Sequence, residues 1–168
     1  MDDLIYCQRD IPRGQWRYGF RASAATGCGW VATYNALRLL GCPADPEEII
    51  RYYERQVPLL HGNAGTLALA PLPYFRRRGF RAEHTSRYDR FDDVAKASDV
   101  CLLFYYWHRK WKFGAHFVAV QYLDGRYIGY NTYTNSTGPD DYGPSLAGFL
   151  RQRKYFGPVL IGINRKSQ

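Results

Sequence analysis

The sequence predicts an α+β fold in which a helical first half packs on an antiparallel sheet supplied by the second half. Apolar residues recur at helical spacing in the first half and in short strand-like runs after it, and a tight-turn signal joins two of those runs. Helices that come first and strands that come second are typical of α+β proteins. The chain has 168 residues and no repeat or low-complexity linker, so we expect a single domain over residues 1–168.

Two helices are predicted early in the chain. The first covers residues 28–40, where apolar side chains recur near helical spacing and a glycine and a proline follow the last of them. The second begins at Asp45, an N-cap residue, with Pro46 in the first helical position and Glu48 placed to complete a capping box.

A third helix is expected over residues 66–78, capped by Thr66 and irregular at its prolines. After it the pattern changes to strands, interrupted by short helices at residues 91–97 and 144–153. Asp124-Gly125 is a strong signal for a two-residue hairpin turn, which predicts antiparallel pairing of the runs on either side. The expected strands cover residues 100–106, 115–122, 126–131 and 159–163.

The formal net charge of +8 favours anionic partners through long-range steering. The basic residues are dispersed in small groups and no nucleic-acid motif accompanies them, so solvated helix ends and loop tips are the preferred interpretation and nucleic acid is not expected as a partner. One segment, residues 107–112, mixes aromatic and basic side chains. We interpret it as a hairpin tip, with a substrate cleft or a nucleic-acid contact as the alternatives.

No apolar run approaches membrane-spanning length, and the acidic first residues lack the basic and apolar regions of a secretory signal. The expected location is therefore the cytoplasm, without a membrane partner. The cysteines lack CxxC spacing and have no histidine close behind them, which argues against a zinc site and a disulfide framework. No metal or other cofactor is expected. The four cysteines are Cys7, Cys28, Cys42 and Cys101.

Cys28 carries the clearest sign of chemistry. It opens an apolar helix between Gly27 and Gly29, which we expect to leave its sulfur open to a substrate. The partial positive charge of a helix N-terminus and a nearby imidazolium both favour the reactive thiolate. The other three cysteines lack such surroundings and are interpreted as packing residues.

His116 is the expected partner of this cysteine. It stands at the head of an apolar strand, from which its ring can project towards a helix packed on the sheet. With a two-residue turn in the following hairpin, Tyr133 faces His116 and Asn131 is its diagonal neighbour on the same face. Asn131 is therefore the expected orienting residue, and Asn135 and Asp124 remain open as polar alternatives.

These residues together resemble the papain-like cysteine peptidases, especially the bacterial branch that includes the bacteriocin leader-processing peptidases. The motifs are Cys28-Gly29 opening a helix, His116 heading an apolar strand, and Asn131 after the hairpin, in the order and spacing of the family. The resemblance implies a papain-like fold with Cys28, His116 and Asn131 as catalytic residues and no cofactor.

One position departs from the family pattern. The family usually carries a glutamine about six residues before the cysteine as a side-chain donor to the oxyanion, and Ala22 stands there in this sequence. Arg21 and Ser23 are neighbouring candidates for that role, together with the backbone N–H of Cys28, whereas Gln15 lies further upstream.

The function implied is hydrolysis of a peptide or other amide bond, an acidic substrate being compatible with the charge. Cys28 attacks the carbonyl, His116 takes and returns the proton, and an acyl-enzyme forms and is resolved. Two alternatives remain open. One is an acyltransferase that passes the same thioester to an amine, and the other is a non-catalytic binding module for an acidic peptide or nucleic acid.

Overall fold

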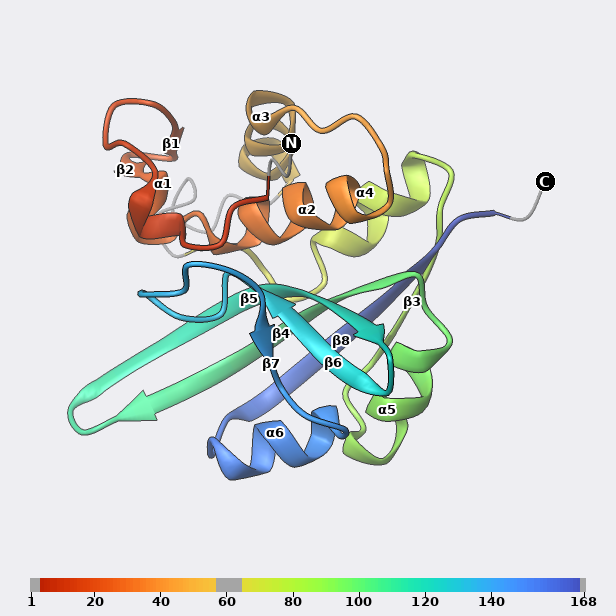
Figure 1. Cartoon of the computed structure of the whole chain (residues 1–168). Coiled ribbons are helices and arrows are strands. Elements are labelled where there is room, and N and C mark those ends of the chain that lie inside the picture. Colours follow the sequence, from red (N-terminus) through yellow and green to blue (C-terminus); the bar gives the residue numbers. More distant parts are fainter. Residues whose placement is uncertain (1–3, 57–64, 167–168) are drawn as a thin grey trace.

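The computed structural model describes residues 4–56 and 65–166. Within them an antiparallel six-stranded sheet has helices on both faces, with α2, α3 and α4 on one side and α5 and α6 on the other (Figure 1). The α+β prediction is confirmed, but the helical first half covers only one face. The helices are η1 (Gln8–Asp10), α1 (Ser23–Thr26), α2 (Cys28–Leu39), α3 (Pro46–Gln56), α4 (Pro71–Arg77), α5 (Tyr88–Lys96) and α6 (Leu146–Gln152).

The large sheet has the strand order β3-β8-β4-β5-β6-β7, and every neighbouring pair is antiparallel. The last strand, β8, therefore returns to the sheet as predicted. A separate two-stranded ribbon, β1 with β2, precedes α1 and was not predicted, since each of its strands has only two residues. The strands are β1 (Arg17–Tyr18), β2 (Arg21–Ala22), β3 (Arg81–Thr85), β4 (Val100–Arg109), β5 (Lys112–Leu123), β6 (Arg126–Tyr130), β7 (Asp140–Asp141) and β8 (Phe156–Asn164).

Alternation along the central strands builds a hydrophobic core on each face of the sheet. Phe104 and Phe117 pack with α2, α3 and α4, whereas Leu103 and Val118 pack with α5 and α6. Successive side chains of a strand point to opposite faces. A sheet buried on both faces therefore carries continuous apolar runs such as the one that opens β4.

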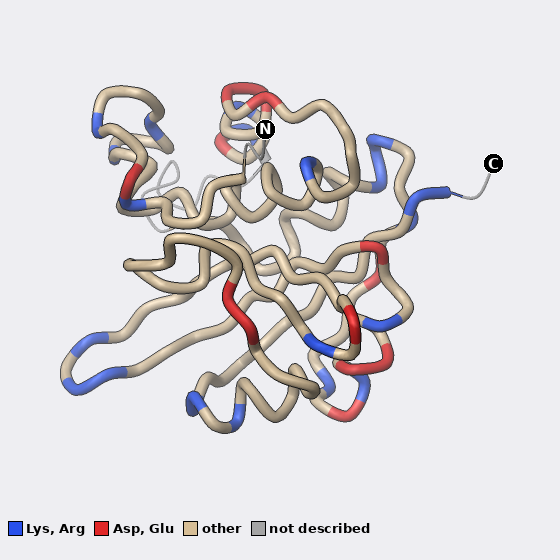
Figure 2. The backbone as a smooth tube through the Cα atoms, viewed as in Figure 1, with Lys and Arg blue, Asp and Glu red and all other residues tan. Residues whose placement is uncertain are grey.

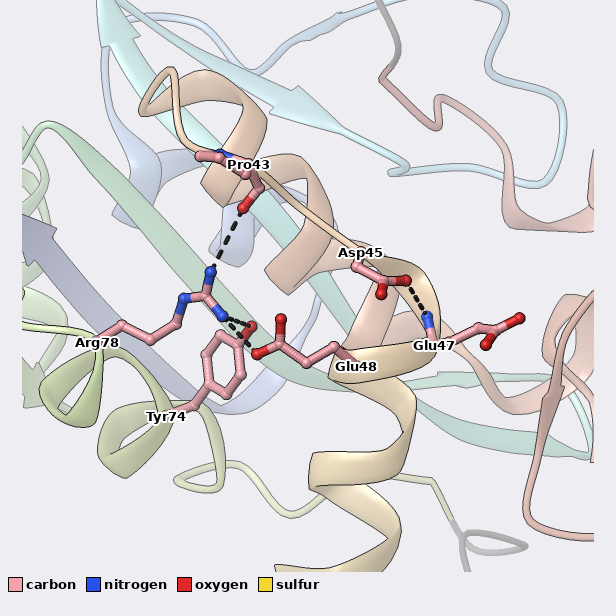
Figure 3. A network of polar contacts seen from close by, with 6 residues as sticks. All are labelled: Pro43, Asp45, Glu47, Glu48, Tyr74 and Arg78. Carbon is pink, nitrogen blue, oxygen red and sulfur yellow. Dashed lines mark hydrogen bonds and ion pairs between the residues drawn. The ribbon is translucent and has the colours of Figure 1, made fainter.

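The N-terminus of α3 is capped as predicted, but the capping box is not completed. Asp45 Oδ1 accepts a hydrogen bond from the main-chain N–H of Glu47 at 2.9 Å. Glu48 does not return to the cap, because its carboxylate pairs with Arg78 at 2.5 Å (Figure 3). Arg78 also donates to the main-chain oxygen of Pro43, so it joins the end of α4 to the start of α3.

The predicted third helix was wrong in its first part. Helix α4 begins at Pro71, in the first-turn position that suits proline, and not at Thr66. The Thr66 hydroxyl instead lies 3.0 Å from that of Tyr18 and is buried with it. Thr66 thus anchors the chain beside the start of α2.

The β5–β6 hairpin has the predicted two-residue turn. Leu123 pairs with Arg126, and the turn residues Asp124 and Gly125 have φ angles of 49° and 82°. Positive φ at both positions is the signature of a type I′ turn. Among the described residues, no helix combines the length and apolarity needed to cross a bilayer.

Candidate active site

Cys28 is the first residue of α2 and is half-buried. The glycines beside it are required by packing. A Cβ at Gly27 would lie 2.5 Å from the main-chain oxygen of Ser23, and one at Gly29 would lie 2.3 Å from Thr66 Oγ1. Both glycines therefore let other segments approach the start of α2 closely.

Helix α2 is positioned by the sheet and by the short helix before it. It packs on β5 and β4, with Trp30 completely buried. Trp30 Nε1 donates to Ser23 Oγ at 3.1 Å, which ties α2 to α1. Cys28 therefore lies where α1 meets α2, and buried contacts with the sheet and with α1 fix the position of this helix start.

His116 lies on β5 opposite Tyr105 of β4, and the two rings meet edge to face with centroids 6.0 Å apart. Pairing between β5 and β6 ends at Ala119 and Tyr130, so His116 lies beyond the end of β6. Its Nε2 lies 2.7 Å from the main-chain oxygen of Asn131. The ring thus turns along the sheet edge towards Asn131, whereas the sequence suggested that it rises towards a helix.

Asn131 holds the imidazole through its main chain and not through its side chain. The carboxamide is directed elsewhere: Oδ1 accepts from the main-chain N–H of Gln8 at 2.8 Å, and Nδ2 donates to Gln8 Oε1 at 3.2 Å. Asn131 is 1% exposed and has a φ of 67°. The expected side-chain contact with His116 was therefore wrong, because a left-handed residue directly after β6 presents its carbonyl instead.

Gln8 belongs to this constellation and was missed from the sequence. Besides its two contacts with Asn131, its Nε2 donates to the main-chain oxygen of Ala24 in α1 at 3.3 Å. It therefore joins the short helix before Cys28 to the residue that holds His116. No motif or periodicity marks Gln8, since its contact with Asn131 spans 123 positions of sequence.

The rest of the N-terminal segment is fastened in the same region. Ile5 exchanges two hydrogen bonds with the carboxamide of Asn35 in α2, at 2.9 and 2.8 Å. The Cys7 thiol donates to the main-chain oxygen of Thr134 at 3.3 Å. The segment thus runs from α2 to the loop after β6 and carries Gln8 to its position.

No hydrogen bond joins the Cys28 sulfur to the His116 ring among the described residues. By strand alternation His116 lies with Tyr105 on the α5/α6 face of β5, whereas Cys28 begins α2 on the opposite face. Two observations show that both groups nevertheless lie near this stretch of β5. The main-chain N–H of Phe117, the residue directly after His116, has a lowering effect on the pKa of the Cys28 thiol. Burial, nearby phenols and then the Cys28 thiol raise the pKa of Tyr105, whose ring touches that of His116.

Burial dominates the protonation of both groups. It raises the pKa of the Cys28 thiol, against a smaller opposing effect of the main-chain N–H groups of Phe117, Gly29 and Cys28 itself. Burial also lowers the pKa of His116, and the hydrogen bond to the Asn131 carbonyl opposes this with a smaller raising effect. Burial therefore favours the neutral form of each group and opposes the thiolate that a helix N-terminus favours.

The candidate oxyanion donors near position 22 differ in their surroundings. Ser23 is fully buried and accepts from Trp30, whereas Arg21 is exposed on β2. Gln15 is exposed and lines a surface hollow of about 230 Å³ between its own segment and α3, whose lining does not include Cys28 or His116. The main-chain N–H of Cys28, at the start of α2, is the remaining candidate donor.

The fold is shared with a solved structure, the peptidase domain of Streptococcus ComA, described as a bi-functional ABC transporter involved in a quorum-sensing pathway. The match has a TM-score of 0.53 and 11% sequence identity, and it covers 84% of this chain and 93% of that one. The two chains therefore share a fold. The resemblance inferred from the sequence is thereby confirmed at the level of the fold. No protein-family model matches the sequence, and no curated protein matches it.

Proposed function

We propose that this protein is a cysteine-nucleophile hydrolase that cleaves a peptide or other amide bond through an acyl-enzyme, with Cys28 as nucleophile and His116 as base. The observation that carries the proposal is the contact of His116 Nε2 with the Asn131 carbonyl. A carbonyl only accepts, so Nε2 carries the proton of the neutral ring and Nδ1 is left as an acceptor. A ring held in this tautomer is prepared to take a proton from a thiol.

The reaction follows from a neutral resting pair. Cys28 Sγ attacks the substrate carbonyl carbon while its proton passes to His116 Nδ1, and the main-chain N–H of Cys28 donates to the developing oxyanion. The imidazolium then protonates the leaving amine as the C–N bond breaks, which leaves a thioester on Cys28. Water, deprotonated by His116, attacks the thioester, and the thiol leaves with the proton.

Asn131 and Gln8 act through His116 as positioning residues. The Asn131 carbonyl fixes the ring, and the two contacts between the Gln8 and Asn131 residues fix that carbonyl. An orienting acceptor stabilises the imidazolium that forms in the transition state only if the acceptor keeps its position, because small misplacements cost much of the rate. The peptidase activity named for the ComA domain makes a peptide the first substrate class to test.

A peptide chloromethyl ketone tests the assignment, since its reaction with a thiol is accelerated by an adjacent imidazole. We expect intact-mass and peptide analysis to find one adduct, on Cys28, and His116→Ala to slow its formation by at least a hundredfold. Cys42→Ser is the matched control and should react like the wild type, because Cys42 lies outside the constellation. Equal labelling of Cys28 in His116→Ala would remove the base from the proposal.

A non-catalytic binding module is the second candidate function. The raised pKa of the Cys28 thiol favours it, because a neutral thiol is a poor nucleophile unless a base assists. The same probe separates the two functions, since a binding module should show slow labelling that does not depend on His116. For an enzyme, an added amine that captures the acyl group in competition with water would identify acyl transfer.

A further inference from the structure

The β4–β5 hairpin ends in an aromatic and basic turn that is called here the hairpin tip, residues 107–113. Figure 1 shows this hairpin extending away from the body of the molecule. β4 ends at Arg109 and β5 begins at Lys112, so Lys110 and Trp111 form the turn. Trp111 is 100% exposed and Phe113 is 63% exposed. An exposed apolar patch rimmed by polar residues marks an interaction site on a soluble protein.

The hairpin tip is cationic and has no acidic residue near it in sequence. No Asp or Glu occurs between positions 100 and 123. Arg109, Lys110 and Lys112 are exposed, and none of them forms a salt bridge within the described part of the chain. Figure 2 shows the turn as basic only, at the far end of the hairpin. These three charges are thus available to an anionic surface.

The base of the tip is packed, whereas its end is free. Tyr106 stacks on Phe113 at 5.6 Å and on Phe156 of β8 at 5.7 Å. The Trp107 ring covers Gly114 so closely that a Cβ there would lie 2.5 Å from it. These contacts support the hairpin from both strands. Within the described residues, Trp111 has no ring contact or hydrogen bond of its own.

Lys110 has a φ of 54°, in the left-handed region that glycine or asparagine adopts more easily. A lysine in this position supplies charge to the turn but leaves the backbone in a conformation that is strained for a residue with a side chain. This agrees with a role for the side chain rather than for the turn alone.

We propose that the hairpin tip docks on an anionic lipid bilayer surface, with Trp111 in the headgroup layer and Arg109, Lys110 and Lys112 against lipid phosphates and carboxylates. Tryptophan favours the membrane interface, and each basic residue near an anionic leaflet adds attraction. The tip is a projecting turn with one free ring, which suits a plane, whereas single-stranded nucleic acid requires a groove with successive stacking rings. Such peripheral contact needs no membrane-spanning segment and does not depend on the proposed hydrolase function.

Vesicle sedimentation tests the docking. The full chain is mixed at low salt with vesicles of phosphatidylcholine alone or of equal parts phosphatidylcholine and phosphatidylserine. We expect binding to the anionic vesicles only, reversed by high salt. Replacing Arg109, Lys110 and Lys112 by Gln, Asn and Gln should lower the partition coefficient about a hundredfold, at about fivefold for each charge. The difference in emission between wild type and Trp111→Ala should shift to the blue on binding.

The matched control removes three exposed charges elsewhere, by Arg55→Gln, Arg81→Gln and Arg90→Gln on α3, β3 and α5. It has the same net charge as the hairpin variant and should retain most of the binding. Equal loss in both triple variants, or wild-type binding by Trp111→Ala, would overturn the proposal. It would also be overturned if the hairpin tip bound a single-stranded oligonucleotide while the protein ignored anionic vesicles.

Discussion

The Nε2 of His116 lies 2.7 Å from the main-chain oxygen of Asn131, and this contact decides which ring nitrogen is left to accept a hydrogen bond. A neutral imidazole has one N–H, so donation from Nε2 leaves the lone pair on Nδ1. The acceptor is an uncharged carbonyl, which stabilises an imidazolium less than a carboxylate does. Burial therefore prevails and the pKa of His116 is lowered.

Substitutions of Asn131 should separate its backbone from its side chain. Asn131→Gly keeps the left-handed backbone but loses the contacts with Gln8, so we expect kcat to fall about tenfold. Asn131→Ala also strains the backbone at a φ of 67° and should cost about a hundredfold. His116→Ala should cost more than either, because the base itself is lost. Steady-state kinetics on one peptide substrate gives this ranking, and equal defects in Asn131→Gly and His116→Ala would contradict it.

The rate of alkylation of Cys28 should increase only at a higher pH than it does for the same cysteine in the unfolded chain. Burial raises the pKa of the thiol, so the thiolate forms at a higher pH than it does in the unfolded chain, where the pKa is about 8.5. We expect site-resolved iodoacetamide labelling to be slow at neutral pH, with a midpoint above that of the same cysteine in urea. A labelling plateau reached already in the acidic range would instead reveal a thiolate–imidazolium pair.

Gln8→Ala should lower kcat with little effect on KM, by roughly ten- to a hundredfold, because the Asn131 carbonyl loses its support. Gln15→Ala is the matched control, since Gln15 is exposed and lies outside the constellation. In the Asn131→Gly background the Gln8→Ala change should have little further effect, as expected for two residues that act as one unit. Additive losses would show that Gln8 acts by another route.

Gly29→Ala should destabilise the fold at the start of α2. Its Cβ would lie 2.3 Å from the Thr66 hydroxyl, so the Thr66 segment has to move, at a cost of about 2 kcal/mol. Gly14→Ala is the control, because no atom lies within 4 Å of a Cβ there. Urea unfolding at equilibrium measures both. Similar midpoints for the two variants would show that the Thr66 contact is easily displaced.

Local patterns predicted the parts of the fold that depend on neighbours in sequence. The spacing of apolar residues indicated α2, and Asp124-Gly125 indicated the hairpin and its register, because a two-residue turn fixes both. Thr66 failed as a helix cap because its hydroxyl bonds to Tyr18, a contact between segments that no local pattern records.

The sequence indicated which residues are candidates for the site, but not which contacts they make. Cys28 and His116 are marked by the elements that begin at or run through them. The exchange of contacts between Asn131 and Gln8 depends on how an N-terminal segment is fastened across the sheet edge, which a sequence pattern does not contain. Burial likewise reverses the pKa shift expected from the helix N-terminus, since it arises only once the layers have packed.

The place of β8 in the sheet has a consequence for biosynthesis. It is the last strand of the chain, and it lies between β3 and β4, where Ile163 pairs with both Ala82 and Val100. During translation, β4, β5 and β6 can pair with one another, but β3 has no neighbour and one edge of β4 stays open. Residues 156–164 must therefore leave the ribosome before β3 can join β4, β5 and β6 in one sheet. A nascent chain thus contains Cys28 long before the fold around it is complete.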